Sequence, residues 1–241
     1  MIAGFIITGN SNKAIVLRGM GPSLAVFGLT DLLLDPVLEF HGSNGSLIAM
    51  NDNWKDTQRS QIEAIKFQPS DDRESVILAT VPPAAYTSIL TGKDNTTGVG
   101  LVEVYDINQA VDSQLANIST RGFVKSGNNV MIGGFILGGN QATSRVAIRG
   151  IGPSLSQFGL KPLLADPTLE LHDANGMTII ANDDWTDDGV AAAQLTLNGL
   201  ALTNPKESGI FTSLPAGAFT VILAGKDGGT GIGLVEIYNL K

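Results

Sequence analysis

The chain contains two copies of one unit, and this duplication is the strongest constraint on its fold. The copies share the patterns Gly-x-Gly-Pro-Ser-Leu, Asn-Asp-x-Trp and Gly-x-Gly-Leu-Val-Glu-x-Tyr. These patterns stand at 19–24 and 150–155, at 51–54 and 182–185, and at 98–105 and 231–238. A separation of about 130 residues is much longer than a solenoid repeat, so each copy should fold as a domain. We expect one domain over 1–110 and a second over 111–241.

The composition excludes several classes of protein. The 241 residues include no cysteine, which rules out disulfides, thiolate metal sites and cysteine nucleophiles. A net charge of −8 argues against binding to nucleic acid or to an anionic membrane surface. No apolar run reaches the roughly 20 residues that span a bilayer, so we expect no membrane insertion.

Short apolar runs bounded by Gly, Asn, Asp and Pro predict strands along the whole chain. Asn44-Gly45 and Asn175-Gly176 are typical hairpin turns between two of these runs in each unit. Without regular crossover helices, the pattern indicates an all-β chain of two tandem antiparallel β-sandwiches, of jelly-roll or immunoglobulin-like kind. The expected strands are 2–8, 13–18, 37–41, 46–50, 75–81, 86–92 and 99–105, then 130–137, 144–149, 168–172, 177–181, 208–214, 218–225 and 232–238.

Each unit should also contain two short helical pieces. Proline near the start and glycine after the end predict one or two turns over 22–27. A second piece is expected over 57–66, with Asp56 or Thr57 as N-cap and with Ile62 and Ile65 facing inward. Its counterpart in the second unit is expected at about 188–197.

A further strand is predicted between the units, over 113–124, and it has no counterpart before Met1. It contains Leu115, Asn117, Ile118 and Phe123, which we single out as a complementing strand. If the first unit lacks its own version, one of its strands has an open edge, and an open edge pairs readily with another chain. Two interpretations remain: the chain is part of a longer tandem array, or a neighbouring molecule adds the strand.

Charged residues in the strands predict ion pairs. Arg18 and Arg149 stand among apolar residues, and a buried charge needs a partner of opposite sign. We expect Arg18 to pair with Glu39 or Glu103, and its counterpart Arg149 to pair with Glu170 or Glu236. The interpretation is structural.

The loops at the Asn-Asp-x-Trp patterns collect oxygen-bearing side chains that suit calcium. They lack the glycine and the distal glutamate of an EF-hand, and the same residues also form turns and helix caps. Both interpretations stay open, and no other cofactor is expected. The candidate ligands are Asn51, Asp52, Asn53 and Asp56, with Asn182, Asp183, Asp184 and Asp187 in the second unit.

Most aromatic residues occur at matching positions of both units, which favours a role in a shared core. We assign Trp54, Trp185, Tyr105 and Tyr238 to the core, together with pairs such as Phe27 and Phe158. Few rings then remain for stacking on a sugar. His41 and His172 are the two histidines, one in each unit, so neither a catalytic triad nor a multi-histidine metal site is expected. We predict no catalytic residues.

The motif set resembles a tandem repeat of large secreted or surface proteins of environmental bacteria. Leu-Ala-Asn-Ile-Ser-Thr-Arg-Gly-Phe-Val at 115–124, Gly-Pro-Ser-Leu, Asp-Pro-x-Leu-Glu, Asn-Asp-x-Trp and Gly-x-Gly-Leu-Val-Glu-x-Tyr support this resemblance. The half from the Asp-Pro strand to Leu-Pro-Ala-Gly-Ala-Phe-Thr-Val at 214–221 is loosely similar to prepeptidase C-terminal domains. The resemblance implies β-sandwiches with a non-catalytic role outside a bacterial cell.

From these observations we expect an extracellular or cell-surface structural or adhesive module. In the first interpretation, it builds a surface or filamentous assembly with other copies of the repeat, through strand or edge complementation. The alternative is a calcium-supported module that binds a glycan or a surface protein, and the third interpretation is a hydrolase accessory domain.

Overall fold

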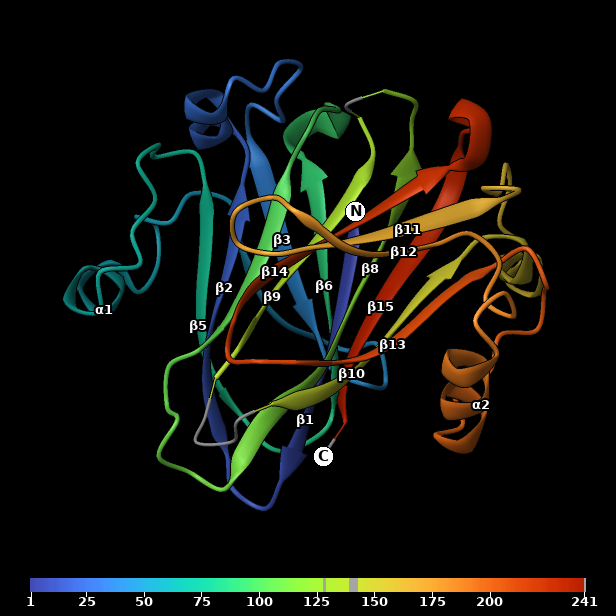
Figure 1. Cartoon of the computed structure of the whole chain (residues 1–241). Helices are drawn as coiled ribbons and strands as arrows, with labels where there is room; N and C mark the ends of the chain where they lie inside the picture. The colour runs from blue at the N-terminus through green and yellow to red at the C-terminus, as the bar shows by residue number, and fades with distance from the viewer. Residues whose placement is uncertain (128, 139–142, 241) are drawn as a thin grey trace. The chain divides into compact units, whose positions relative to one another are not determined.

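The computed structural model describes residues 1–127, 129–138 and 143–240. Contacts divide the chain into two compact units, Met1–Ala116 and Asn117–Lys241. Figure 1 labels the strands and helices, with the chain coloured from blue at the N-terminus to red at the C-terminus. This division falls a few residues after the boundary expected from the sequence. Among the described residues, no helix is long and apolar enough to cross a membrane.

The first unit contains two sheets of antiparallel strands. One sheet has the order β1-β6-β3-β4 and the other the order β5-β2-β7. Its strands are β1 (Ile2–Gly9), β2 (Lys13–Met20), β3 (Pro36–His41), β4 (Leu47–Asn51), β5 (Ser75–Val81), β6 (Ala85–Gly92) and β7 (Leu101–Asp106). Its helices are α1 (Arg59–Ala64) and the short 3-10 helices Pro22–Phe27 and Lys93–Asn95.

The second unit repeats this plan with one more strand. Its sheets have the orders β12-β11-β14-β9 and β13-β10-β15-β8, again antiparallel. The strands are β8 (Ser113–Val124, whose first residues belong to the first unit), β9 (Met131–Leu137), β10 (Ser144–Ile151), β11 (Pro167–His172), β12 (Thr178–Asn182), β13 (Ser208–Leu214), β14 (Gly217–Gly225) and β15 (Gly231–Leu240). The helices are α2 (Gly189–Leu197) and the 3-10 helices Pro153–Phe158 and Lys226–Gly228.

Within each unit the two sheets share one hydrophobic core. In the first unit, Phe5, Phe40 and Tyr86 from one sheet pack in a cluster with Ile15 and Leu17 from the other. In the second unit, residues of both sheets likewise form one cluster, which includes Val124 of β8. The alternation of buried and half-buried residues along β1 and β3 is what a strand with one face on a core requires. The prediction of a mainly antiparallel β chain is therefore confirmed.

The second helical piece of the first unit differs from its prediction. α1 begins at Arg59, and Gln58 precedes it with a φ of 56°, so neither Asp56 nor Thr57 is the N-cap. Gln58 instead exchanges two hydrogen bonds with the backbone of Leu78. Ile62 is buried as expected, but Ile65 is 37% exposed because the helix ends before it. In the second unit, Asp188 caps α2 by accepting from two backbone N–H groups.

The Asn-Gly turns form the expected hairpins. β3 pairs with β4, and β11 pairs with β12. Gly45 and Gly176 have φ values of 78° and 79°, a backbone conformation that glycine adopts without a steric cost. These turns place the Asn-Asp-x-Trp loops at the far ends of β4 and β12.

Candidate functional site

The outer edge of β7 is the feature that most distinguishes the two units. β7 lies at the end of its sheet, and among the described residues its one strand partner is β2. The corresponding strand β15 lies between β10 and β8. Among the described residues, no strand lies along β7 in the place that β8 holds along β15.

Burial at matching positions shows the consequence of the open edge. Val235 and Ile237 of β15 are 1% and 4% exposed, whereas their counterparts Val102 and Val104 of β7 are only half-buried. Gly231 is buried and its counterpart Gly98 is exposed. The sequences of the two strands are nearly the same, so the neighbouring strand causes the difference.

β8 completes the core of the second unit with two side chains. Val124 is fully buried in that core, and Ile118 packs against it. The Asn117 side chain donates a hydrogen bond to the Ile237 carbonyl at 3.1 Å. Of the other residues singled out in this segment, Leu115 packs on the core of the first unit and Phe123 is 51% exposed.

The strand arginines form the cores of two matching polar clusters. Arg18 Nε donates to Glu103 Oε2 at 2.6 Å, and Tyr105 Oη donates to Glu103 Oε1 at 2.8 Å. The Arg18 guanidinium also lies 5.8 Å from the centre of the Tyr105 ring. Burial is the main cause that raises the pKa of Tyr105 to about 12, and the bond to Glu103 adds to it.

The second unit repeats this cluster. Arg149 Nε donates to Glu236 Oε2 at 2.8 Å, and the guanidinium lies 5.7 Å from the centre of the Tyr238 ring. Burial again raises the pKa of Tyr238. Tyr105 and Tyr238 are half-buried residues of these clusters rather than fully buried core residues.

The other two glutamates considered as arginine partners bond to histidines. Glu39 Oε2 accepts a hydrogen bond from His41 Nε2 at 2.8 Å, and Glu170 Oε2 accepts one from His172 Nε2 at 2.9 Å. The pKa of His41 is raised, chiefly by the bond to Glu39. Of the two glutamates considered for each arginine, the structure therefore confirms Glu103 and Glu236 as the partners. Glu39 and Glu170 bond instead to the histidine two residues away on the same face of the strand.

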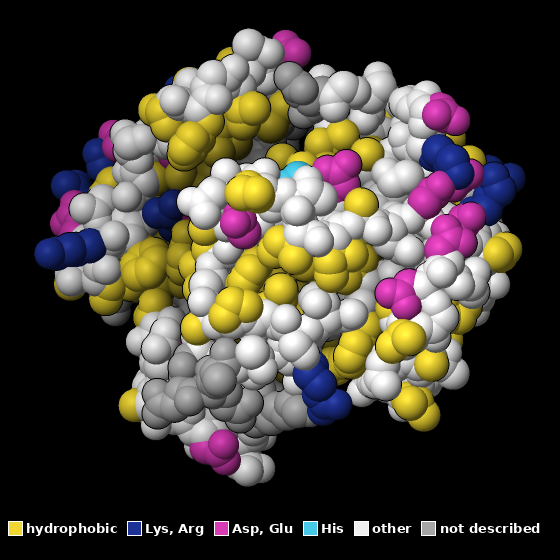
Figure 2. All heavy atoms as spheres, viewed as in Figure 1, with side chains coloured by type: hydrophobic (Ala, Val, Ile, Leu, Met, Phe, Trp, Pro, Cys, Tyr) yellow, Lys and Arg dark blue, Asp and Glu magenta, His cyan; other side chains and the backbone are white. Residues whose placement is uncertain are grey.

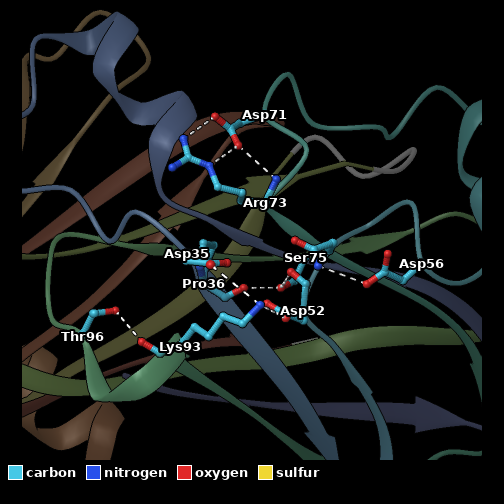
Figure 3. Close-up of polar contacts among 10 residues, drawn as sticks. Asp35, Pro36, Asp52, Asp56, Asp71, Arg73, Ser75, Lys93 and Thr96 are labelled. Atoms are coloured by element: carbon cyan, nitrogen blue, oxygen red, sulfur yellow. Dashed lines mark hydrogen bonds and ion pairs between the residues drawn. The ribbon is translucent and has the colours of Figure 1, made fainter.

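The first acidic loop is neutralised by a lysine of the same unit. Lys93 Nζ lies 2.6 Å from Asp52 Oδ2 and 3.9 Å from Asp35 Oδ2. Figure 3 shows Lys93 reaching toward Asp52 and Asp35, with Ser75 bonded to the backbone beside them. Asp52 is the largest cause of a raised pKa at Lys93. An ammonium group therefore occupies the side of Asp52 where a cation was considered.

The asparagines of these loops bind backbone groups. The Asn51 side chain accepts from Val76 N–H and donates to the Asn53 carbonyl, and Asn182 makes the matching bonds to Gly209 and Asp184. Each amide oxygen thus holds a backbone N–H group of the fold, and a role of these asparagines as metal ligands stays a prediction. The Asn53 side chain donates to Asp56 Oδ2 at 3.1 Å, so these two candidate ligands contact each other within the loop.

The second acidic loop brings three carboxylates together. Oxygens of Asp166, Asp183 and Asp184 lie within 4.8 Å of one another. Lys226 pairs with Asp183, and Lys206 lies 2.8 Å from Asp166. Asp187 is placed in a turn, where its N–H donates to the Asp184 carbonyl. Asp166 and its counterpart Asp35 were not foreseen as members of these groups, although both precede proline in the repeated Asp-Pro pattern.

Sequence reasoning also missed a buried carboxylate in each unit. Glu74 is fully buried, and its Oε1 accepts from the backbone N–H groups of Gly21 and Ser23 at 2.9 and 2.8 Å. Glu207 accepts in the same way from Gly152 and Ser154, at 3.1 and 2.9 Å. These bonds hold the Gly-x-Gly-Pro-Ser segment in place. The available signal was the repeated Glu-Ser pair at the start of β5 and β13.

The aromatic residues are not all in the core. Trp54 is buried and Trp185 is half-buried, but Phe27 and Phe158 are 76% and 66% exposed. Both phenylalanines end a short 3-10 helix whose inward residue is a leucine, so the ring turns to solvent and the core assignment for this pair is wrong. Figure 2 shows apolar side chains gathered in patches on the viewed face.

The edge strands β4 and β12 also expose apolar side chains. Leu47, Ile48 and Met50 of β4 are 46–56% exposed, and Ile179 of β12 is 42% exposed. Exposed apolar residues on an end strand favour association with another protein surface. A shallow depression lined by polar residues of 55–63 opens widely to solvent and has no such character.

Comparisons with known proteins give no family for this chain. No family model and no curated protein matches it. Among solved structures, the chain is similar to the major capsid protein P2 of bacteriophage PM2, with 10% identity, a TM-score of 0.27, and coverage of 100% of this chain and 92% of that one. It is also similar to VP2 of infectious bursal disease virus, with 7% identity, a TM-score of 0.20, and coverage of 98% and 68%. TM-scores this low do not establish a shared fold.

Proposed function

We propose that the chain is a non-catalytic structural module that joins other copies of the repeat outside the cell. In this proposal each unit is a jelly-roll or immunoglobulin-like domain, and the joint is made by strand pairing. The observation that supports it most is the open edge of β7 beside side chains that are covered in the second unit. The resemblance to repeats of secreted and surface proteins supports the extracellular location.

The physical argument starts from the cost of an unpaired edge. A free strand edge presents N–H and C=O groups in a row, and pairing with another strand satisfies them without any change of fold. The apolar residues exposed on β4 and β12 add surfaces that lose contact with water on association. In both units the Arg–Glu–Tyr clusters bond internally, which supports a structural role for them rather than a catalytic one.

Sedimentation and negative-stain microscopy test this proposal. The purified chain should form dimers or longer assemblies as its concentration rises. A matched control carries an extra copy of residues 113–130 before Met1, so that its own added strand can cover β7. This control should associate less than the unaltered chain. A chain that stays monomeric up to millimolar concentration contradicts the proposal.

A second candidate function is a calcium-supported module that binds a glycan or a surface protein. The observation that favours it is the close approach of Asp166, Asp183 and Asp184. Calcium would have to displace Lys226 from Asp183, because the ammonium now neutralises that carboxylate. If calcium binds, millimolar calcium should raise the melting temperature, a chelator should reverse the rise, and Asp184→Asn should abolish it. An unchanged melting temperature rejects this candidate.

A further inference from the structure

We propose that the edge of β7 binds the leading strand of another copy of the repeat, an extended segment of the same type as β8, in an antiparallel register. The inference rests on the proposed function and specifies its partner. The second unit shows what the equivalent edge binds, because β8 runs antiparallel along β15 there. The partner is therefore a defined strand rather than any apolar surface.

The register follows from the match between β15 and β7. In the second unit, Ile118 stands opposite Ile237, Thr120 opposite Val235 and Arg121 opposite Leu234. The counterparts of these three β15 residues are Val104, Val102 and Leu101 of β7. The bound strand would thus place its isoleucine opposite Val104 and its arginine opposite Leu101.

The side chains of β8 explain why this strand fits. Val124 and Ile118 face the core of the second unit, and the first unit contains half-buried Val102 and Val104 where such side chains would pack. A Cβ built on Gly233 would lie 3.2 Å from Val124 Cγ2, so glycine allows the close approach of β8. β7 is preceded by Gly100 at the same position. The first unit therefore retains the residues that accept the strand.

Backbone groups on the β7 edge are also placed for pairing. The Ile237 carbonyl accepts from the Asn117 side chain, so the backbone of Ile237 faces β8. In a strand, the N–H and C=O of one residue point to the same side, and residues two apart share that side. By the match of the strands, Val104 and Val102 present their backbone groups to the open edge.

Disulfide trapping with a synthetic peptide tests the strand and its register together. The chain has no cysteine, so single cysteines can be placed without interference. Leu101→Cys is chosen because Leu101 is 37% exposed and stands where Arg121 of the strand is expected. The probe is a peptide of residues Ser113–Val124 with Arg121→Cys, used in a glutathione buffer. Val102 and Val104 present their backbone groups to the edge, so Leu101 and Arg121 would form a non-hydrogen-bonded pair. The Cα atoms of such a pair lie about 4.5 Å apart, which is within the range of about 4.4–6.8 Å found in disulfides.

Three controls accompany this experiment. A Thr120→Cys peptide turns its thiol to the other face of the strand and should react at least about tenfold more slowly. An Ile118→Asp, Arg121→Cys peptide loses the buried isoleucine and should bind about tenfold more weakly or worse. Leu234→Cys in the second unit tests the matching edge, which β8 already covers, and should not react.

The outcomes either support or overturn the inference. Rapid coupling of Leu101→Cys with the Arg121→Cys peptide alone supports it. No coupling, equal coupling of both peptides, or equal coupling at Leu234→Cys overturns it. Fluorescence anisotropy of the labelled peptide with the unaltered chain gives the answer if Leu101→Cys does not fold, and no binding there also overturns the inference. A monomeric chain that binds the peptide would refute the proposed assembly alone, whereas an oligomer that rejects the peptide would refute this inference alone.

Discussion

The two units differ at one edge although their sequences agree at almost every motif. Both hold an arginine against a glutamate beside a tyrosine, and both bury a glutamate under the Gly-x-Gly-Pro-Ser segment. Yet Val235 is buried where Val102 is half-buried. The residues of β7 and β15 match, but β15 has a strand on both sides and β7 has one on a single side. The comparison therefore shows that the second neighbouring strand decides how deeply these valines are buried.

Loss of the buried glutamate should have the largest effect on both units. Glu207→Ala leaves the N–H groups of Gly152 and Ser154 without their acceptor, and should lower the free energy of unfolding by about 3 kcal/mol. Glu74→Ala should cost a similar amount in the first unit. Urea unfolding followed by circular dichroism measures both. A clear difference between the two variants would break the equivalence of the two units at this site.

Truncation of matching valines on β15 and β7 should destabilise the two units by different amounts. Val235→Ala removes methyl groups from a closed core and should cost about 2 kcal/mol, whereas Val102→Ala should cost about 1 kcal/mol because water already reaches that site. The same unfolding measurement compares them. Equal losses would mean that the open edge does not weaken packing at β7. Addition of the Ser113–Val124 peptide should raise the cost of Val102→Ala toward that of Val235→Ala.

Removal of an arginine should have a smaller effect. Arg149→Met leaves Glu236 without its partner, and should cost about 1–2 kcal/mol because the side chains are 18% and 15% exposed and partly solvated. Arg18→Met should behave alike in the first unit. Thermal unfolding with good expression of both variants gives the comparison. An unchanged melting temperature for Arg149→Met would show that the pair does not stabilise the unit.

The smallest expected effect is the loss of stability when the buried tyrosines ionise at alkaline pH. Burial raises the pKa values of Tyr105 and Tyr238, that of Tyr105 to about 12, so the folded state favours the neutral phenol. The stability that each contributes is complete below about pH 10, the pKa of an unfolded tyrosine, and is lost as pH rises through the folded pKa. In a pH titration, the ultraviolet absorbance of tyrosinate should appear at a higher pH in the folded chain than in the chain unfolded in urea. Coincident titrations would contradict the burial of both rings.

The repeated motifs predicted the strands well, because each is a short apolar run between residues that favour turns. The predictions 75–81 and 208–214 coincide with β5 and β13, and every other predicted strand begins and ends within two residues of the observed one. For each strand arginine, the sequence limited the ion-pair partner to two glutamates. The sequence could not choose between them, since Glu39 and Glu103 stand in similar strands and only the sheet order brings Glu103 opposite Arg18.

The acidic loops were harder to predict for a related reason. Oxygen-bearing side chains in one loop suggest a cation site, but Lys93 and Lys226 reach these carboxylates from short 3-10 helices far away in the sequence. Phe27 and Phe158 were predicted in the core because they occur at matching positions of both units. Matching positions can also be exposed in both units, as these two rings are.

By itself, the sequence determined that one β unit occurs twice and that a further strand lies between the two units. Local propensity and turn chemistry are written in neighbouring residues, so they can be read directly. The sheet order, the buried glutamates, the lysine partners and the uncovered face of β7 depend on residues brought together from distant positions. Only the tertiary structure could decide these, because strand pairing depends on which edges meet in space.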